Sequence, residues 1–205
     1  MPARKPANER KAEIVDQMLR LADEVGPDRL TTQTVADTLG LSQPAIFRHF
    51  PTKQALWRAV AETISDRLIS AWTEVLNTST DPMRRIEGLV CEQLRQIEAM
   101  PAIPTILFSR ELQAENDDLR LSVLALMTNL VTTLTDEFAK GQKSGLFRSD
   151  LAPKDGAYLL VSLVQGLAIR WTLGKRGFRL EAEGRRLLAT QMKLFQTAMS
   201  TEEPS

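Results

Sequence analysis

The amino-acid sequence predicts an all-α protein, with short helices near the N-terminus and longer helices over the rest of the chain. Two observations lead to this class. Apolar residues recur at steps of three and four from end to end, which is the period of an amphipathic helix. No segment alternates apolar and polar residues convincingly. We therefore expect about nine helices and no sheet.

The first helix should place Ile14, Met18 and Leu21 on one face and end at Gly26-Pro27, a usual C-terminal signal. A second, very short helix is expected to end at Gly40, with Thr32 as its capping residue.

A third short helix should follow directly. Ser42 can cap it, and Pro44 fits its first turn, where a proline loses no intrahelical hydrogen bond. This helix should end at Phe50, because the residue before Pro51 is pushed out of the helical conformation. Two short helices joined by a tight turn make a helix-turn-helix. Ile46 and Phe50 share its inward face.

The remaining helices are longer. Pro101 and Pro104 should break the chain between two of them, and Gly141 should end another. The expected helices cover residues 53–77, 82–100, 105–114, 117–140, 155–172 and 180–199.

Composition excludes several classes of protein. The longest apolar segment, Ala157 to Trp171, is shorter than the roughly 18 residues of a membrane span, and Gln165 and Arg170 interrupt it. No apolar run follows the basic N-terminus, so we expect no secretory signal, no membrane partner and a cytoplasmic protein.

Catalytic constellations are also missing. The chain has one histidine, His49, and one cysteine, Cys91, and it has neither a glycine-rich phosphate loop nor a nucleophile elbow. We therefore expect no enzyme, no cofactor and no metal site. Cys91 lies in an apolar helical pattern and should be a small buried side chain.

Charge is distributed unevenly although the formal net charge is zero. Residues 38–61 contain no Asp or Glu but include Arg48, Lys53 and Arg58, and the first dozen residues are also basic. A local positive patch is what attraction to phosphate requires. The alternative is a solvated surface that merely lacks acids.

The segment "LTTQTVADTLGLSQPAIFRHFPTKQALWRAV", residues 30–60, resembles the DNA-binding region of the tetracycline-repressor (TetR) family. The resemblance rests on the threonine, the Val-Ala pair, Leu-Gly-Leu-Ser, His-Phe, Pro-x-Lys and Ala-Leu at their spacings. It implies an N-terminal helix-turn-helix domain, residues 1–52, and a C-terminal ligand-binding and dimerisation domain, residues 53–205.

The resemblance also implies which residues meet an operator in double-stranded DNA, since the start of a recognition helix reaches base edges. Gln43 can pair with adenine, and Pro44 and Ala45 suit a thymine methyl group. His49 can instead cap or pack locally, and at Phe47 the family more often has tyrosine. The implied DNA-binding residues are Thr32, Gln33, Gln43, Pro44, Ala45, Phe47, Arg48, His49 and Lys53.

The helix at residues 155–172 is apolar almost all round, so both its faces need a partner. As in the family, two copies of this helix and the last one could make a four-helix homodimer interface. The alternative is a monomer whose last helix covers its own core. The expected interface residues are Leu163, Gly166, Leu167, Leu187, Leu194 and Phe195.

A small-molecule effector, apolar or amphiphilic, is implied by the resemblance as well. The residues expected to line its pocket are Trp72, Leu94, Phe108, Met127, Tyr158 and Gln165. The chain is thus interpreted as a homodimeric transcriptional regulator, a repressor that its ligand releases from DNA. The alternative is a helical ligand-binding or adaptor protein whose helix-turn-helix is only a packing module.

Overall fold

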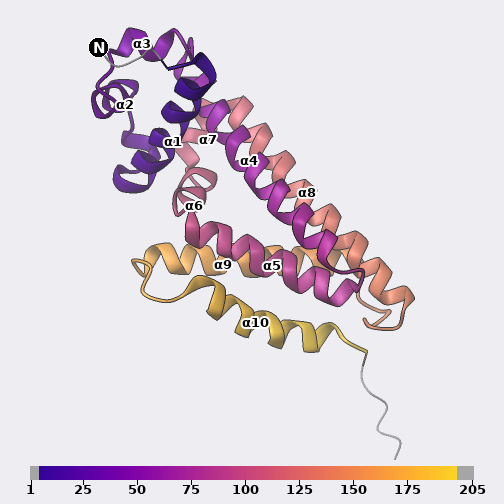
Figure 1. The fold of residues 1–205 in the computed structure, drawn as a ribbon. Coiled ribbons are helices and arrows are strands. Elements are labelled where there is room, and N and C mark those ends of the chain that lie inside the picture. Colours follow the sequence, from indigo (N-terminus) through magenta and orange to yellow (C-terminus); the bar gives the residue numbers. More distant parts are fainter. Residues whose placement is uncertain (1–4, 198–205) are drawn as a thin grey trace, which may run out of the picture. The chain divides into compact units, whose positions relative to one another are not determined.

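The computed structural model describes residues 5–197, and in this part of the chain the expected all-α class is confirmed (Figure 1). Ten α-helices, one more than expected, and one short 3₁₀ helix, η1, are present there. The elements are α1 (Ala7–Val25), η1 (Pro27–Arg29), α2 (Thr32–Thr38), α3 (Gln43–Phe47), α4 (Lys53–Thr78), α5 (Pro82–Ala99), α6 (Ala102–Leu107), α7 (Arg110–Glu115), α8 (Asp117–Lys143), α9 (Pro153–Leu173) and α10 (Leu180–Phe195). The extended pairing in this part is an isolated antiparallel bridge between Phe147 and Gln196.

The chain divides into two compact units. The first contains the residues up to Ile69 together with Ala99–Leu126, and the second contains Ser70–Glu98 together with the residues from Met127 onward. Helices α4 and α8 therefore each run from one unit into the other. The expected domain boundary between residues 52 and 53 remains a prediction.

In the first unit, α1 packs against α2 and α6, and α2 packs against α3. Ile14, Met18 and Ala22 lie on the buried face of α1, at the four-residue spacing that the sequence shows. Ile46 and Phe50 are buried, as expected. The N-terminal helices thus form a packed body around one apolar centre.

Two helix ends in this unit differ from the prediction. Thr31, not Thr32, is the N-cap of α2, and its Oγ1 accepts a hydrogen bond of 3.1 Å from the backbone N–H of Thr34. Thr32 is the first helical residue, and its side chain is buried. α3 ends at Phe47, three residues earlier than expected, and a turn at residues 48–49 follows it before Pro51.

The segment expected to form one helix at residues 105–114 forms two, α6 and α7. Pro104 does not break α6, because it is the third residue of that helix, where the backbone N–H would have no intrahelical acceptor. Ser109 begins α7 by accepting a hydrogen bond of 3.0 Å from the N–H of Leu112. Its hydroxyl also donates to Asp28 in η1, at 2.5 Å.

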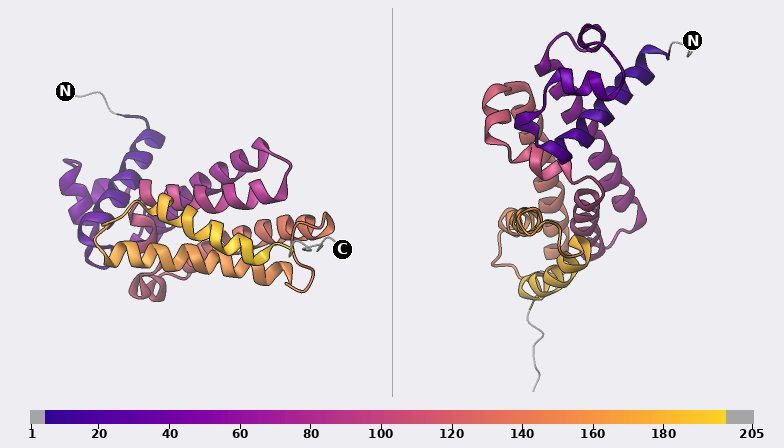
Figure 2. Two further views of the ribbon diagram at one scale, coloured as in Figure 1. Left: turned by 90° about the horizontal axis from the view of Figure 1, so that it is seen from below. Right: turned by 90° about the vertical axis from the view of Figure 1, so that its left-hand side faces the viewer.

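In the second unit, α9 and α10 lie side by side (Figure 2). Gly184 of α10 lets Leu94 of α5 approach so closely that an added Cβ would overlap its side chain. Cys91 is buried in the same unit, as expected. Its burial raises the pKa of the thiol. The expected end of the last helix, Met199, lies outside the described residues, and α10 ends at Phe195.

Helix α9 is long and apolar enough to cross a membrane by length and composition alone, but 44% of its most apolar window is buried inside the protein. A helix in the core of a protein can have the same length and the same apolar composition.

The second unit contains an aromatic cluster. The ring of Phe138 lies 4.9 Å from that of Phe147 and 5.4 Å from that of Phe195. A Cβ on Gly141 would overlap the Phe147 ring, and this ring is fully buried. Gly141→Ala should therefore lower the free energy of unfolding, because overpacking costs about 1–3 kcal/mol while the gain in helix propensity is about 1 kcal/mol.

Urea unfolding of Gly141→Ala measures this difference. In a Phe147→Leu background, where the ring is absent, the same glycine change should cost less. An equal cost in both backgrounds would show that contact with Phe147 is not the cause.

Candidate nucleic-acid interface

The turn between α2 and α3 is fixed by its backbone. Gly40 has φ +63°, a left-handed conformation that glycine adopts without strain. The N–H of Leu41 donates to the carbonyl oxygen of Ala36 at 2.8 Å. This geometry sets the direction in which α3 leaves α2.

α3 has one buried and one open side. Ser42 occupies its N-cap position, and Ile46 anchors it in the core. Pro44, Phe47 and Arg48 are exposed. The first turn and the outer side of α3 are therefore free to meet a large ligand.

Gln43, at the first position of α3, is held by a residue of α2. Its Nε2 donates a hydrogen bond of 2.8 Å to Oγ1 of Thr32. Thr32 is only 8% exposed. The structure thus joins these two predicted site residues, but it places Thr32 behind Gln43 rather than on the surface.

The other predicted DNA-binding residues have different surroundings. Gln33 is exposed and donates to Oδ1 of Asp37, one turn later in α2, at 2.6 Å. Ala45 is half-buried on α3. His49 is half-buried just after α3. Lys53 is half-buried at the first position of α4.

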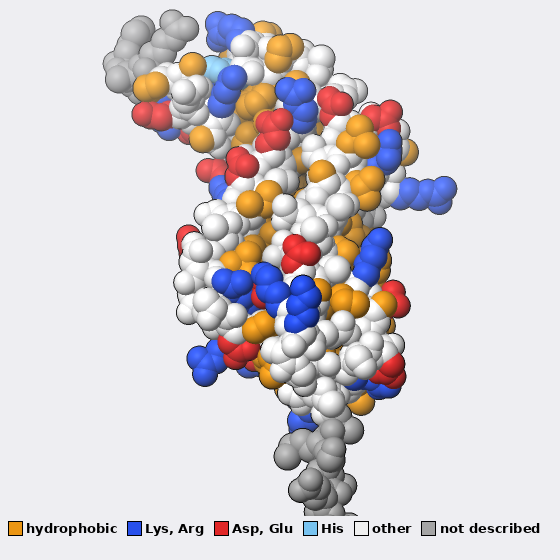
Figure 3. Space-filling view, turned by 90° about the vertical axis from the view of Figure 1, so that its right-hand side faces the viewer, with side chains coloured by type: hydrophobic (Ala, Val, Ile, Leu, Met, Phe, Trp, Pro, Cys, Tyr) orange, Lys and Arg blue, Asp and Glu red, His pale blue; other side chains and the backbone are white. Residues whose placement is uncertain are grey.

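A basic groove of about 420 Å³ lies between the start of α1 and α3. Figure 3 shows Lys and Arg side chains around the single histidine. The described residues that line the basic groove are Lys5, Ala7, Arg10, Lys11, Leu41, Ala45, Arg48 and His49.

One carboxylate is bonded to two of these cations. Glu13 accepts hydrogen bonds from Lys5 at 2.9 Å and from Arg10 at 2.7 Å. The hydrogen bond from Lys5 is the main reason why the pKa of Glu13 is lowered. The sequence shows that Lys5, Arg10 and Lys11 are basic, but only folding brings them beside Arg48.

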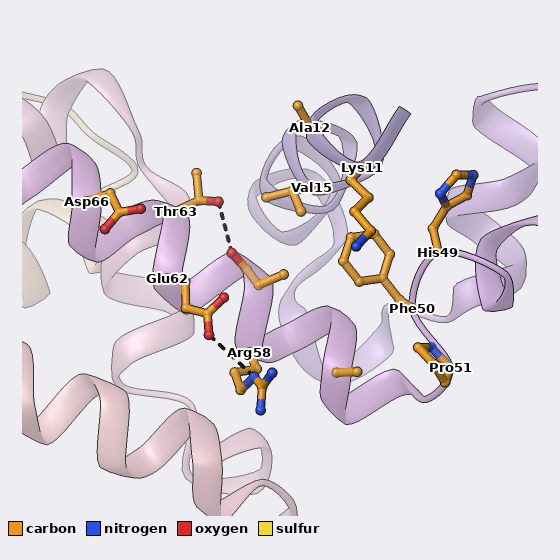
Figure 4. A pocket seen from close by; sticks show the side chains of 12 residues that line it. Lys11, Ala12, Val15, His49, Phe50, Pro51, Arg58, Glu62, Thr63 and Asp66 are labelled. Atoms are coloured by element: carbon orange, nitrogen blue, oxygen red, sulfur yellow. Dashed lines mark hydrogen bonds and ion pairs between the residues drawn. The ribbon is translucent and has the colours of Figure 1, made fainter. Parts of the chain in front are cut away.

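A second groove, about 440 Å³, lies between α1 and the start of α4 (Figure 4). Lys11 lies over the ring of Phe50 there, with Nζ 5.9 Å from the ring centroid. Arg58 forms ion pairs with Glu62 at 3.4 Å and with Asp118 at 3.8 Å. Residues 38–61 contain no acidic residue, but folding brings Asp118 of α8 next to Arg58.

The residues expected to line an effector pocket do not share one environment. Trp72 and Leu94 are buried, Met127 and Gln165 are half-buried, and Phe108 and Tyr158 are about half exposed. Phe108 belongs to the first unit and the other five to the second. Nε1 of Trp72 donates to Oε1 of Gln93 at 3.1 Å, which adds a buried polar pair that we did not predict.

The residues expected at a dimer interface fall into two groups. Leu167 and Phe195 are buried within the chain. Leu163 and Leu187 are half-buried, Gly166 has open space around it, and Leu194 is 62% exposed. Exposed leucine and isoleucine side chains flank Gly166 along α9, and we name these residues together the α9 stripe: Leu159, Gly166, Ile169 and Leu173.

Among residues 5–197, no group of three or more His, Cys, Asp or Glu side chains is arranged to hold a metal ion.

Comparisons with known proteins cover nearly the whole chain. Residues 14–60 match the family model described as bacterial regulatory proteins, tetR family. Residues 62–193 match the model described as YsiA-like protein, C-terminal region.

A nucleoid occlusion factor, SlmA of Alteromonas mediterranea, is 31% identical over 134 residues, which are 65% of this chain and 68% of the relative. Two solved structures share the fold. A transcriptional regulator from Saccharomonospora viridis in complex with choline is 24% identical, with a TM-score of 0.81 and coverage of 91% of this chain and 96% of its own. FadR from Bacillus subtilis, in complex with stearoyl-CoA, is 14% identical, with a TM-score of 0.75 and coverage of 92% and 98%.

Proposed function

Because this chain belongs to the tetR family of bacterial regulatory proteins, we propose that it represses transcription at an operator and leaves that operator when a small molecule binds. Membership makes it a DNA-binding transcriptional regulator in a family without enzymatic activity. The observation that carries the proposal is the first turn of α3, where Gln43 is held by Thr32 beside the basic groove. We place this action in the cytoplasm, where bacterial DNA lies.

In this proposal α3 enters the major groove and its first residues read bases. The amide of Gln43 suits adenine, which offers an N–H donor and a ring-nitrogen acceptor. The exposed ring of Pro44, with Ala45 beside it, suits a thymine methyl group. Arg48 and the cations of the basic groove are in a position to attract backbone phosphates.

The roles of Gln43 and Lys53 can be separated by mutation once the operator has been selected from genomic fragments. Gln43→Ala should weaken the free energy of operator binding by about 1–3 kcal/mol. It should also relax the base preference at one position in each half-site. Lys53→Ala should weaken binding to all sequences similarly, and it should reduce the salt slope by about one. Fluorescence anisotropy with operator and random DNA at several salt concentrations measures both effects.

If both variants lose the same affinity on operator and random DNA, Gln43 does not read a base. If binding is absent, or insensitive to salt, the alternative of a helical adaptor protein becomes the better description.

We further propose that the regulator acts as a homodimer, joined through α9 and α10. The α9 stripe and Leu194 support this arrangement, since they leave apolar surface uncovered by the chain itself. Two copies of each helix would form a four-helix contact. A dimer can place two copies of α3 roughly 34 Å apart, in successive major grooves.

The effector is proposed to bind among the helices of the second unit and to be apolar or amphiphilic. The solved structures with stearoyl-CoA, which is amphiphilic, and with choline, which is a small organic cation, show that this fold binds small molecules in those proteins. Trp72 and Gln93 provide a buried polar pair within an otherwise apolar region. Such a pair can orient a ligand that enters beside it.

Helix α4 provides a continuous connection for the response, since it begins at Lys53, carries Trp72 and ends at Thr78. A ligand that prefers a spacing of the α3 helices unsuited to DNA must lose affinity when operator is present, by the same factor as it weakens operator binding. Typical coupling of this kind is about 1–3 kcal/mol.

Trp72→Ala should therefore blunt the ligand response more than it lowers operator affinity. Calorimetric titration of a ligand, with and without operator, measures the coupling in the wild type and in the variant. Identical ligand affinities in the wild type with and without operator would contradict the mechanism.

A further inference from the structure

The geometry points to Thr32 as a positioning residue that orients the Gln43 amide for base reading. This inference rests on the proposed role of Gln43. Its basis is the hydrogen bond of 2.8 Å from Gln43 Nε2 to Thr32 Oγ1, which joins α2 to α3 across eleven residues of sequence. Thr32 itself is too deeply buried to be a broad contact surface for DNA.

Thr32 is available for this role because its neighbour takes the capping role. Thr31 Oγ1 accepts the hydrogen bond from the N–H of Thr34, and it also lies 2.8 Å from the hydroxyl of Thr34. The hydroxyl of Thr32 faces Gln43 instead. Two adjacent threonines therefore have separate tasks, since Thr31 caps the start of α2 and Thr32 holds a side chain of α3.

The hydrogen bond leaves the reading groups of Gln43 available. A primary amide has two N–H groups and one carbonyl oxygen. After one N–H has donated to Thr32, the other N–H and Oε1 remain, and adenine requires one donor and one acceptor. The hydrogen bond to Thr32 also restricts the rotamers of Gln43 before DNA binds, so less side-chain entropy is lost on binding.

Gln33 shows what a glutamine in this unit does without a partner on another helix. It donates to Asp37 of its own helix, at spacing i, i+4, and lies exposed. Gln43 is instead half-buried and tied to a buried hydroxyl. The two glutamines are therefore held differently, and of the two it is the amide of Gln43 that is tied to a neighbouring helix.

The test compares Thr32→Val, which keeps the shape of the side chain but removes the hydroxyl, with Thr32→Ser, which keeps the hydroxyl. Both are combined with wild-type Gln43 and with Gln43→Ala. The readout is the ratio of affinities for the operator and for operators altered at the position that Gln43→Ala identifies. The salt slope is measured in parallel.

Thr32→Val should lower this ratio about threefold to tenfold, the range that one neutral hydrogen bond supplies, with the salt slope unchanged. Thr32→Ser should keep most of the wild-type ratio. In the Gln43→Ala background, Thr32→Val should change the ratio no further, since the oriented amide is gone. If Thr32→Val does not fold, Thr32→Ala carries the same expectation.

The possible results distinguish a failure of base reading by Gln43 from a failure of the positioning role of Thr32. If Gln43→Ala changes the preference at no position, base reading by Gln43 is wrong, and the inference about Thr32 falls with it. If Gln43→Ala relaxes one position while Thr32→Val and Thr32→Ala keep the wild-type ratio, Thr32 does not orient Gln43, and base reading stands. If Thr32→Ser lowers the affinity ratio as much as Thr32→Val does, the role of the hydroxyl is also overturned.

Discussion

Replacing Arg85 with alanine is expected to lower the free energy of unfolding by about 3–5 kcal/mol, because it removes the more buried of the two cations that pair with the buried Glu137 carboxylate. Nη1 of Arg85 bonds to Oε1 of Glu137 at 3.1 Å, and Glu137 is only 2% exposed. Nε donates to the carbonyl oxygen of Ser79 at 2.6 Å, and Nη2 donates to that of Leu76 at 2.9 Å. One guanidinium thus ties α5 both to the end of α4 and to α8.

Lys140 gives the matched comparison. It also bonds to Oε1 of Glu137, at 2.6 Å, but its side chain is about half exposed, so Lys140→Ala should cost about 1 kcal/mol or less. Replacing both Arg85 and Glu137 with methionine removes the two charges together and should cost less than Arg85→Ala alone. Chemical denaturation measures all three variants. Equal losses for Arg85→Ala and Lys140→Ala would contradict the larger contribution expected of Arg85.

Leu194→Glu and Gly166→Glu are expected to give monomers or aggregates and to weaken operator binding on the order of 10²-fold or more, although neither residue is placed at the DNA surface. Leu194 is exposed in the single chain, and Gly166 has open space around it. The fold of one chain should therefore tolerate either glutamate. In a dimer joined through α9 and α10, the same carboxylates would be buried without partners, which is costly.

Two controls make this test specific. Thr132→Glu adds the same charge at an exposed position on α8 and should leave a dimer with normal DNA affinity. Leu167→Glu buries a charge inside one chain and should unfold it instead. Sedimentation velocity gives the mass of each variant, circular dichroism its helix content, and DNA titration its affinity. A Leu194→Glu variant that remains dimeric and binds with full affinity would show that the interface is elsewhere.

The class of fold and much of the helix-turn-helix follow from local patterns in the sequence. The spacing of Ile14, Met18 and Ala22 along one face, the glycine after α1 and the proline in the first turn of α3 act within a few residues of the backbone. Local rules of this kind hold wherever the segment folds. The family resemblance of residues 30–60 was likewise present in the sequence, and the match of residues 14–60 to the tetR family confirms it.

Features that depend on partners far away in the sequence could not be predicted and are seen only in the folded chain. Thr31 and Thr32 are equally able to cap a helix, and in the structure Thr31 caps α2 while the hydroxyl of Thr32 accepts the hydrogen bond from Gln43 of α3. The charge of Arg58 is countered by Asp118, sixty residues later in the sequence.

Glu137 and Arg85 look like surface charges in the sequence and become a largely buried pair on folding. The sequence indicates that both faces of α9 need a partner, and the structure shows which face the chain itself leaves uncovered, the α9 stripe. Charge pairing and burial depend on which helices meet, and helix periodicity does not specify those contacts.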